Sequence, residues 1–202
     1  MIAFLFLVAV IFGYLLGSAN SALIVSRYYH VDIRDHGSGN AGATNTLRVL
    51  GKTAALITTA GDVAKGFLAY FLGCLLLHGH ISLVHLGGLA AGSAAIVGHS
   101  WPIYFGFRGG KGSWTSFAVA LSFDWRIGVS LLMVFAIVLF FWRIVSLAAI
   151  VGAVLLPLFS VVFVGCRAAT TIFGVLAVLA VYRHRANIKR ILNGHEPKLG
   201  ER

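Results

Sequence analysis

A glycine-rich stretch with one central lysine contains the residues whose types best suit chemistry on an anion. Residues 98–116 read GHSWPIYFGFRGGKGSWTS, and Lys111 is flanked by Gly110 and Gly112. Glycines let backbone N–H groups approach an anion closely, and the lysine adds a positive charge. An apolar run begins at Ser113, so an oxyanion beside Lys111 would also face the N-terminus of a helix. The pattern predicts a phosphate-binding loop.

The stretch does not match the nucleotide-binding P-loop, GxxxxGK[ST]. The first glycine of that pattern would fall at position 105, which is Phe, and Gly112 follows the lysine. No strand-like alternation precedes the stretch, so nucleotide hydrolysis is not favoured. His99, near its start, is a candidate oriented donor, and the alternative is an ordinary interface residue.

A second polar region, residues 36–52, reads HGSGNAGATNTLRVLGK. Arg48 offers the planar guanidinium fork that suits a phosphate, and its neighbours supply hydroxyl and amide groups. A solvated loop of turn formers is the alternative, but such a loop rarely gathers so many small polar residues beside one arginine. We therefore expect a functional loop, with candidate ligands Gly37, Ser38, Gly39, Asn40, Thr44, Asn45 and Arg48.

A third polar region is the basic tail, whose residues 182–197 read YRHRANIKRILNGHEP. His184 and Asn187 are three residues apart, so on a continuing helix they would share one face. The surrounding arginines and lysines are alternatively explained as anchors to anionic lipid. We expect Glu196 to hold a loop through an ion pair.

The composition requires a membrane. The chain of 202 residues is 59% hydrophobic and 11% charged, with a mean hydropathy of +0.91, whereas soluble domains carry about 25% charged residues. The formal net charge of +10 gathers in loops and in the tail, so membrane topology explains it better than nucleic-acid binding. Cys74 and Cys166 stand singly within apolar runs and predict buried thiols rather than a metal site.

The apolar runs predict an all-α integral membrane protein. We expect a bundle of about seven transmembrane helices, one of them short, in a single domain over residues 1–202. The distribution of lysine and arginine places the N-terminus outside and both glycine-rich loops and the C-terminus in the cytoplasm. A count of six stays open because 113–123 is short. The expected spans are 1–26, 53–77, 81–98, 113–123, 126–141, 145–164 and 168–182, with a polar loop over 27–52.

Two charged residues, Asp62 and Lys65, lie at membrane depth within the second expected span. They are three residues apart and share a helix face, so we expect them to pair inside the bundle. A role in shaping a polar cleft is the alternative. His78, His80 and His85 cluster in sequence, but they lack carboxylates and a fixed helical spacing, so no metal site is expected.

Together, the three polar regions resemble the motifs of the acyl-phosphate:glycerol-3-phosphate acyltransferase family of bacterial membrane enzymes. Gly37–Arg48 matches GSGNxGATNxxR, Gly98–Thr115 matches GHxWPxxFxFxGGKGxxT, and His184–Glu196 matches HxxNIxRLxxGxE with Ile191 in place of leucine. Two further departures are Ala41, where the family often has proline, and Trp114, where a small residue is usual. The resemblance covers nearly the whole chain in the family's order and spacing.

The resemblance implies transfer of a fatty acyl group from acyl phosphate to the 1-hydroxyl of glycerol 3-phosphate, giving lysophosphatidic acid and inorganic phosphate. Arg48 and Lys111 would stabilise developing charge, while His184 and Asn187 would orient the attacking alcohol. Whether His184 or a substrate phosphate takes the proton stays open, and Ser38 as a covalent acyl carrier is less favoured. The implied phosphate- or substrate-binding residues are Gly37, Ser38, Gly39, Asn40, Thr44, Asn45, His99, Gly109, Gly110, Gly112 and Thr115.

The same resemblance implies no metal and no other cofactor, and a multi-pass location in the bacterial cytoplasmic (inner) membrane with the site facing the cytoplasm. The basic tail is also compatible with recruiting an upstream phosphate acyltransferase that supplies the donor. The alternative from another class is a small transporter or channel for a phosphorylated solute. It predicts charged or broken elements near mid-membrane and internal symmetry. A lipid phosphatase would need a nucleophilic histidine with a basic partner.

Overall fold

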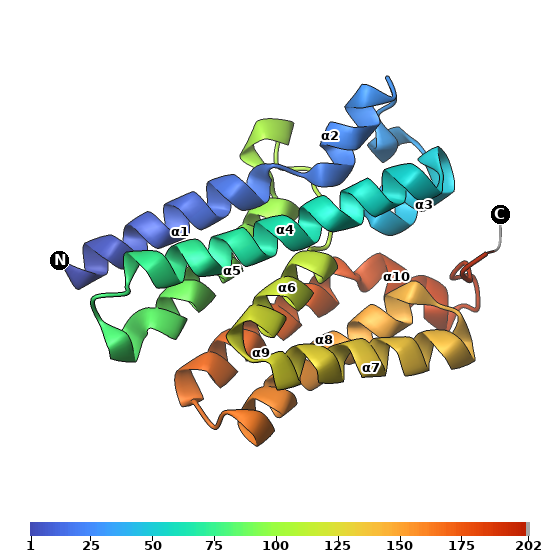
Figure 1. Ribbon diagram of the computed structural model, residues 1–202. Coiled ribbons are helices and arrows are strands. Elements are labelled where there is room, and N and C mark those ends of the chain that lie inside the picture. The colour runs from blue at the N-terminus through green and yellow to red at the C-terminus, as the bar shows by residue number, and fades with distance from the viewer. Residues whose placement is uncertain (201–202) are drawn as a thin grey trace. The chain divides into compact units, whose positions relative to one another are not determined.

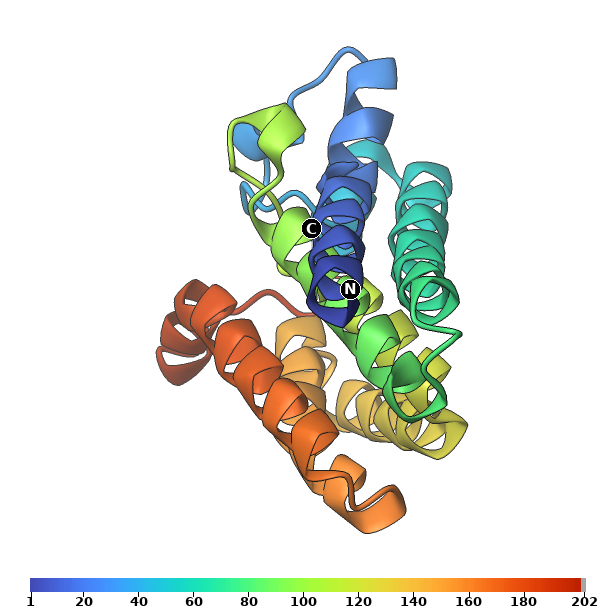
Figure 2. The same ribbon diagram turned by 90° about the vertical axis from the view of Figure 1, so that its left-hand side faces the viewer.

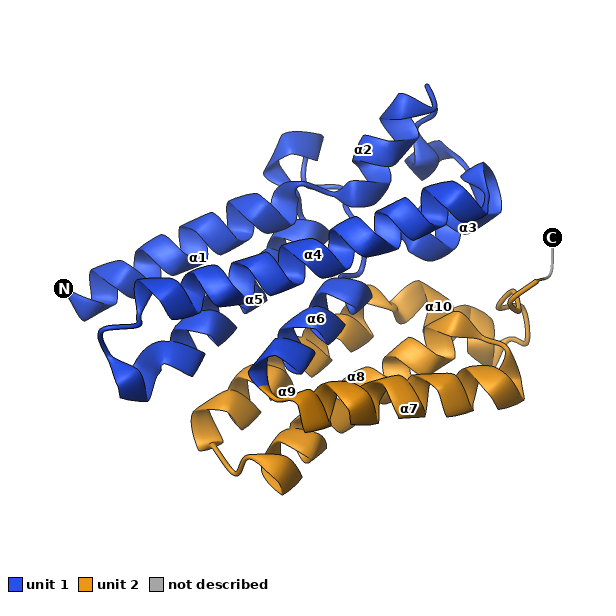
Figure 3. Cartoon of the chain, viewed as in Figure 1, with its two compact units in different colours: residues 1–123 blue, residues 124–202 orange. Residues whose placement is uncertain are grey.

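The computed structural model describes residues 1–200, in which the regular structure is helical and no strand occurs (Figure 1). This confirms the expected all-α class. By length and composition, 5 segments are able to cross a membrane, as expected of a multi-pass protein. They are Ile2–Tyr28, Lys52–Leu76, Ile81–Phe105, Trp125–Trp142 and Val145–Phe163. The chain divides into two compact units, residues 1–123 and residues 124–202 (Figure 3).

The first unit is organised around α5. This helix packs against α1, α4 and α6, and α1 also runs beside α4 (Figures 1 and 2). Short 3-10 turns at Ile33–Asp35, Ile81–Leu83 and Ile103–Phe105 complete the unit. Its helices are α1 (Ile2–Ser18), α2 (Ser21–Tyr28), α3 (Ala43–Leu50), α4 (Lys52–Leu76), α5 (Val84–Ser100) and α6 (Ser113–Phe123).

Small residues bring α1 and α5 into backbone contact. Gly17 lies so close to the backbone of Ala95 that a Cβ would overlap it, and Gly98 lies equally close to the backbone of Tyr14. Helices in lipid gain little from the hydrophobic effect, so close approach through small side chains is a main source of their association. The glycines of α5 therefore fix where its C-terminal end, including His99, lies beside α1.

Two regions of the first unit are built differently from what the sequence suggests. The span expected over 1–26 is confirmed as the candidate span Ile2–Tyr28, but it is not one helix, since α1 ends at Ser18 and α2 begins at Ser21. The Asn20 side chain causes the new start, because its Oδ1 accepts the N–H of Leu23 at 3.1 Å as a helix N-cap. The polar loop expected over 27–52 contains α3, which buries its polar Asn45 and Thr46 instead of exposing them.

The second unit contains α7 (Trp125–Trp142), α8 (Val145–Phe163), α9 (Arg167–Arg183) and α10 (Arg185–Leu192), with α8 packed against both α7 and α9. The continuous helix expected through His184 is wrong, because α9 ends and α10 begins at that residue. At 17 and 11 residues, α9 and α6 are shorter than the 5 spanning segments. The expected helix count and the orientation of the termini stay predictions.

Candidate functional site

The first candidate loop, residues 36–48, is shaped by Asn45 from within. Asn45 reaches back from α3, where its Oδ1 accepts the N–H of Ser38 at 2.8 Å. Its Nδ2 donates to the carbonyl oxygens of Ile33 and His36, both at 3.0 Å. Gly37 and Gly39 adopt left-handed backbone angles, with φ of 60° and 68°, that allow the loop to curl around this amide. Asn45 therefore sets the shape of the loop.

Other predicted ligands of this loop are accessible. The side chains of Ser38 and Arg48 are exposed, and those of Asn40 and Thr44 are half-buried. Arg48 lies in the last turn of α3, one turn beyond Asn45. A hydroxyl and a guanidinium are thus presented by a loop whose backbone is fixed, which is what binding of a phosphate ester requires.

The lysine loop, residues 109–112, folds back onto the end of α5. The N–H of Gly110 donates to the carbonyl oxygen of His99 at 3.1 Å, and Gly112 has a φ of 76°. A Cβ on Gly110 would collide with Nε2 of His99 and with the carbonyl oxygen of Ala41. Lys111 is half-buried and leads directly into α6. The structure therefore brings the first two predicted loops into contact at Gly110.

Asn20 joins the same two loops from the break between α1 and α2. Its Nδ2 lies 3.4 Å from the carbonyl oxygen of Ala41 and 3.4 Å from that of His99, and the residue is fully buried. Asn20 was not among the residues predicted from the sequence. Its signal was a carboxamide within an otherwise apolar stretch, since polar side chains at membrane depth are costly and mark polar sites.

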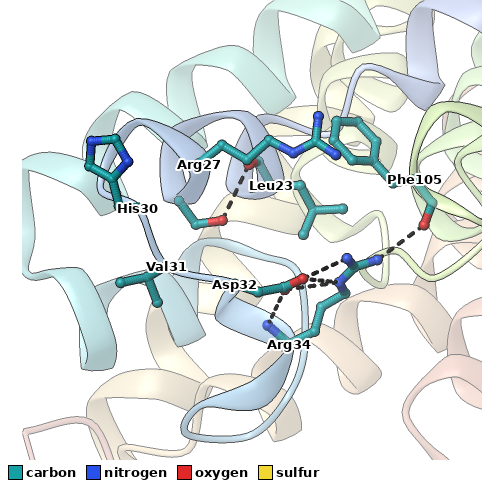
Figure 4. A pocket seen from close by; sticks show the side chains of 8 residues that line it. Leu23, Arg27, His30, Val31, Asp32, Arg34 and Phe105 are labelled. Atoms are coloured by element: carbon teal, nitrogen blue, oxygen red, sulfur yellow. Dashed lines mark hydrogen bonds and ion pairs between the residues drawn. The ribbon is translucent and has the colours of Figure 1, made fainter.

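A cluster of charged and aromatic groups, called the clasp below, also joins residues 27–34 to the glycine-rich stretch 98–116 (Figure 4). Arg34 pairs with Asp32 at 2.6 Å and donates from Nη1 to the carbonyl oxygen of Phe105 at 3.0 Å. The guanidinium of Arg27 lies 4.7 Å from the centroid of the Phe105 ring. These four residues, with Leu23, Ser26, His30 and Val31, line a pocket of about 230 Å³. Hydrogen bonding from Arg34 lowers the pKa of Asp32 to about 2.

The charged pair at membrane depth is confirmed. Lys65 Nζ lies 2.9 Å from Asp62 Oδ1, and both side chains are buried. The same Nζ lies 2.8 Å from Nδ1 of His99. Thr115, a predicted ligand, is fully buried and donates to the backbone carbonyl of Asp62 at 3.1 Å, so its hydroxyl ties α6 to α4.

The third motif lies in the second unit. Nδ1 of His184 is 2.8 Å from the carbonyl oxygen of Ala180, one turn earlier in α9. Asn187 Nδ2 donates to Oε1 of Glu196 at 2.5 Å. His184 and Asn187 are both buried. The two residues therefore stand at the junction of α9 and α10 rather than on one uninterrupted helix.

Glu196 fastens the tail, as the sequence predicts. Ser146 donates to Oε1 at 2.7 Å, and Arg190 pairs with Oε2 at 2.7 Å. Burial acts to raise the pKa of Glu196, but hydrogen bonds from Ser146, Asn187 and Arg190 outweigh it and lower that pKa.

Within residues 1–200, no group of three or more His, Cys, Asp or Glu side chains is placed to hold a metal ion. Of the clustered histidines, His85 is instead paired with the hydroxyl of Tyr70 at 2.8 Å. Cys74 and Cys166 are free thiols, and both are half-buried rather than buried as the sequence predicts.

Comparisons with known proteins identify the family of this chain. A family model described as Glycerol-3-phosphate acyltransferase matches residues 7–194. The chain is 41% identical over 191 residues to a glycerol-3-phosphate acyltransferase of Parasynechococcus marenigrum, covering 94% of this chain and 88% of that protein. It is 41% identical over 193 residues to one of Thermoanaerobacter pseudethanolicus, covering 95% and 94% of the two chains.

Solved structures show the same fold. Crystal structures of PlsY (YgiH), described as an integral membrane glycerol 3-phosphate acyltransferase, match in two forms. The glycerol 3-phosphate form matches with a TM-score of 0.88 at 34% identity over 96% of each chain. The lysophosphatidic acid form matches with a TM-score of 0.85 at 33% identity over 97% of this chain and 96% of that one. This chain belongs to the glycerol-3-phosphate acyltransferase family.

Proposed function

We propose that this protein transfers a fatty acyl group from acyl phosphate to the 1-hydroxyl of glycerol 3-phosphate. The products are lysophosphatidic acid and inorganic phosphate. Family membership supports the acyltransferase class, and the solved relatives are described as glycerol 3-phosphate and lysophosphatidic acid forms. The observation that carries the proposal is the contact, at Gly110, between the lysine loop and the loop that bears Ser38 and Arg48.

In this proposal Arg48 and Lys111 hold the phosphates and stabilise charge. Both substrates carry phosphate, and phosphate is the leaving group, so a cationic, glycine-lined site serves binding and catalysis together. Ser38 and the N–H groups of the glycine-rich loops contact phosphate or glycerol oxygens. Because an acyl phosphate is already activated, holding the two reactants together supplies much of the rate enhancement.

His184 is the proton acceptor in this scheme. A carbonyl oxygen only accepts, so Nδ1 of His184 donates to Ala180, and the acceptor nitrogen of the neutral ring is Nε2. The ring also lies at the C-terminus of α9, where the helix dipole favours positive charge. As the 1-hydroxyl oxygen attacks the acyl carbon, the bond to the phosphate oxygen breaks, the phosphate departs, and the hydroxyl proton moves to Nε2.

Three predicted residues take positioning roles in the proposal. Asn45 shapes the first loop, Thr115 fixes the start of α6, and Asn187 holds the tail through Glu196. The hydrogen bonds already made by these groups support positioning over direct contact with substrate. Asn40, Thr44, Gly37, Gly39, Gly109 and Gly112 stay with the substrate-binding loops.

The proposed setting is the bacterial cytoplasmic membrane, with the site open to the cytoplasm and all of residues 1–202 forming one catalytic domain. The concentration of arginine and lysine in residues 27–52 and 183–202 supports this orientation. Glycerol 3-phosphate then arrives from the water phase, and the acyl chain lies among helices. The basic tail is where an upstream acyl-phosphate-forming enzyme would dock.

An acyl-transfer assay tests the proposal. Purified protein in lipid is given labelled glycerol 3-phosphate with either palmitoyl phosphate or palmitoyl-CoA. We expect labelled lysophosphatidic acid with palmitoyl phosphate alone, and loss of product in Lys111→Ala and Arg48→Ala. Lys52→Ala is the matched control, because this exposed lysine lies four residues after Arg48, at the start of α4, and has no role in the site. Product from palmitoyl-CoA alone would contradict the donor, and solute uptake without product would favour a transporter.

A further inference from the structure

The break between α1 and α2 is filled by polar groups that the proposed chemistry does not use. Breaking a membrane-spanning helix frees backbone groups that need partners inside the protein. Lys65 Nζ lies 3.4 Å from the carbonyl oxygen of Ala19, at the break, while Asn20 caps α2 and contacts both glycine-rich loops. Asp62 and Lys65 are thus the inner end of a polar chain that runs from α4 to the loops.

The partner of His99 defines its tautomer. Nδ1 of His99 lies 2.8 Å from Lys65 Nζ and 3.4 Å from Asp62 Oδ1. An ammonium group donates and never accepts, so at the shorter distance Nδ1 must be the acceptor. The proton of the neutral imidazole is therefore on Nε2. That nitrogen is the atom that lies against Gly110, beside the carbonyl oxygen of Ala41.

His99 therefore contacts the lysine loop through both its backbone and its ring. Its backbone oxygen accepts the N–H of Gly110 at 3.1 Å, and its ring edge fills the space next to the Cα of the same glycine. The ring itself is held by Lys65, which Asp62 holds in turn. Any rotation of the ring would move Gly110, and Lys111 follows Gly110 directly in the chain.

We propose that Asp62 and Lys65 are positioning residues that lock the ring of His99 as the Nε2–H tautomer, while Asn20 holds the carbonyl oxygens of His99 and Ala41, and that together they set the spacing between the lysine loop and the Ser38–Arg48 loop. The inference deepens the proposed function and rests on it for its catalytic consequence. The Nε2–H tautomer makes His99 a fixed hydrogen-bond donor, which agrees with the oriented donor expected from the sequence.

Stability alone does not explain a buried ion pair. Replacing such a pair with apolar residues of similar volume is often neutral or stabilising, because both charges had to be desolvated. Lys65, however, supplies one ammonium to three separate groups, namely Asp62, His99 and Ala19. A methionine of similar length fills the same space and orients none of them. Positioning and stability can therefore be separated by substitution.

The first experiment reads the tautomer directly. Nitrogen NMR of protein labelled with 15N-histidine in lipid nanodiscs distinguishes protonated from unprotonated ring nitrogens. The His99 signals are assigned by their loss in His99→Gln. We expect an unprotonated Nδ1 and a protonated Nε2 in the unmodified protein, and mixed tautomers in Asp62→Leu/Lys65→Met. A protonated Nδ1 in the unmodified protein would overturn the inference.

The second experiment separates positioning from folding. Asp62→Leu/Lys65→Met removes both charges, so we expect thermal unfolding close to that of the unmodified protein. We also expect kcat to fall by about 10- to 100-fold, since a misplacement of about 1 Å costs this much, with a smaller change in KM for glycerol 3-phosphate. Thr58→Val is the control, because this buried residue lies one turn before Asp62 on α4 and its hydroxyl makes no hydrogen bond.

The outcomes distinguish this inference from the proposed function. A stable double variant with unchanged kcat would show the pair to be structural only and would overturn the positioning role. Absence of acyl transfer by the unmodified protein from any donor would overturn the proposed function instead. The 15N spectrum would still decide the tautomer in that case, because it needs no substrate.

Discussion

His99 in the first unit and His184 in the second are alike in burial and placement but opposite in chemistry. Their exposed fractions are 2% and 3%, and each stands at the C-terminal end of a helix. Nδ1 of His99 faces an ammonium at 2.8 Å, whereas Nδ1 of His184 faces a carbonyl oxygen at 2.8 Å. The first Nδ1 therefore accepts and the second donates.

This difference shows that the partner of a histidine, rather than its motif, decides where its proton lies. His99 presents a fixed N–H donor at Nε2, while His184 presents an acceptor nitrogen at Nε2. Both stand within family motifs, from which His184 was predicted as a catalytic residue and His99 as a substrate-binding donor. The contrast supports the proposed division of roles, in which His99 holds a loop and His184 takes a proton.

The largest expected effect comes from removing the acceptor. His184→Ala should lower kcat by about 10²- to 10⁴-fold, the range typical of a lost general base. The measurement is single-turnover acyl transfer from palmitoyl phosphate. His195→Ala is the matched control, since this exposed tail histidine has no place in the site and should behave normally. Equal activity of the two variants would mean that a substrate phosphate takes the proton.

The next largest effect is on the free energy of unfolding and comes from the ion pair beside His99. Lys65→Met alone leaves Asp62 buried without its cation, which should cost about 3–5 kcal/mol in the free energy of unfolding. Asp62→Leu/Lys65→Met should recover most of that loss. Thermal and denaturant unfolding in detergent measure both. Equal stability of the single and double variants would mean that Asp62 does not depend on Lys65 as its partner. The contrast between the two histidines, which rests on that pairing, would then be contradicted.

In the motif of His184, Glu196 is the residue that holds the tail in place through its hydrogen bonds. Glu196→Gln should cost about 1.5–3 kcal/mol, since it replaces hydrogen bonds to a charged group. The pKa of Glu196 is lowered in the folded protein from 4.5, so its stabilisation is complete above pH 4.5 and is lost as the pH falls through the lower folded value. Limited proteolysis of the tail at pH 7 and pH 4 tests this. A tail equally protected at both values would contradict it.

The smallest effect compares two similar clasps. In the first unit Asp32 pairs with Arg34, which also binds the carbonyl oxygen of Phe105. In the second unit Asp124 pairs with Arg126, whose Nη2 donates to the carbonyl oxygen of Phe163 at 2.7 Å. Both are largely at the surface, so Arg34→Gln should cost less than about 1 kcal/mol and Arg126→Gln should have little effect on stability.

These two variants should nevertheless differ in activity. The clasp of Arg34 holds Phe105, which precedes the lysine loop, so Arg34→Gln should lower kcat a little while Arg126→Gln leaves it unchanged. The Asp32–Arg34 contribution is complete above pH 3.8 and is lost toward about pH 2, where Asp32 takes up its proton. Matching losses of activity would show that neither clasp is specific to the site.

The sequence alone determined the class of protein and supplied the candidates for the groups that do its chemistry. High hydropathy over long runs requires helices in lipid, because backbone groups there must be paired internally. The pairing of Asp62 with Lys65 followed from helical spacing, and the role of Glu196 followed from its isolation in a basic tail. Ser38, Arg48 and Lys111 were proposed because their types suit phosphate chemistry, and His184 mainly because its motif resembles that of the family.

Only the tertiary structure decided how those groups are held. Asn20 lies 21 and 79 residues from the two carbonyl oxygens that it joins, so no local pattern could predict its contacts. The tautomers of His99 and His184 depend in the same way on atoms brought to them by folding. Helical spacing and polarity can be read from residues close together in the sequence. The direction of a hydrogen bond depends on which two groups folding brings together. The fold therefore assigned the donor and the acceptor.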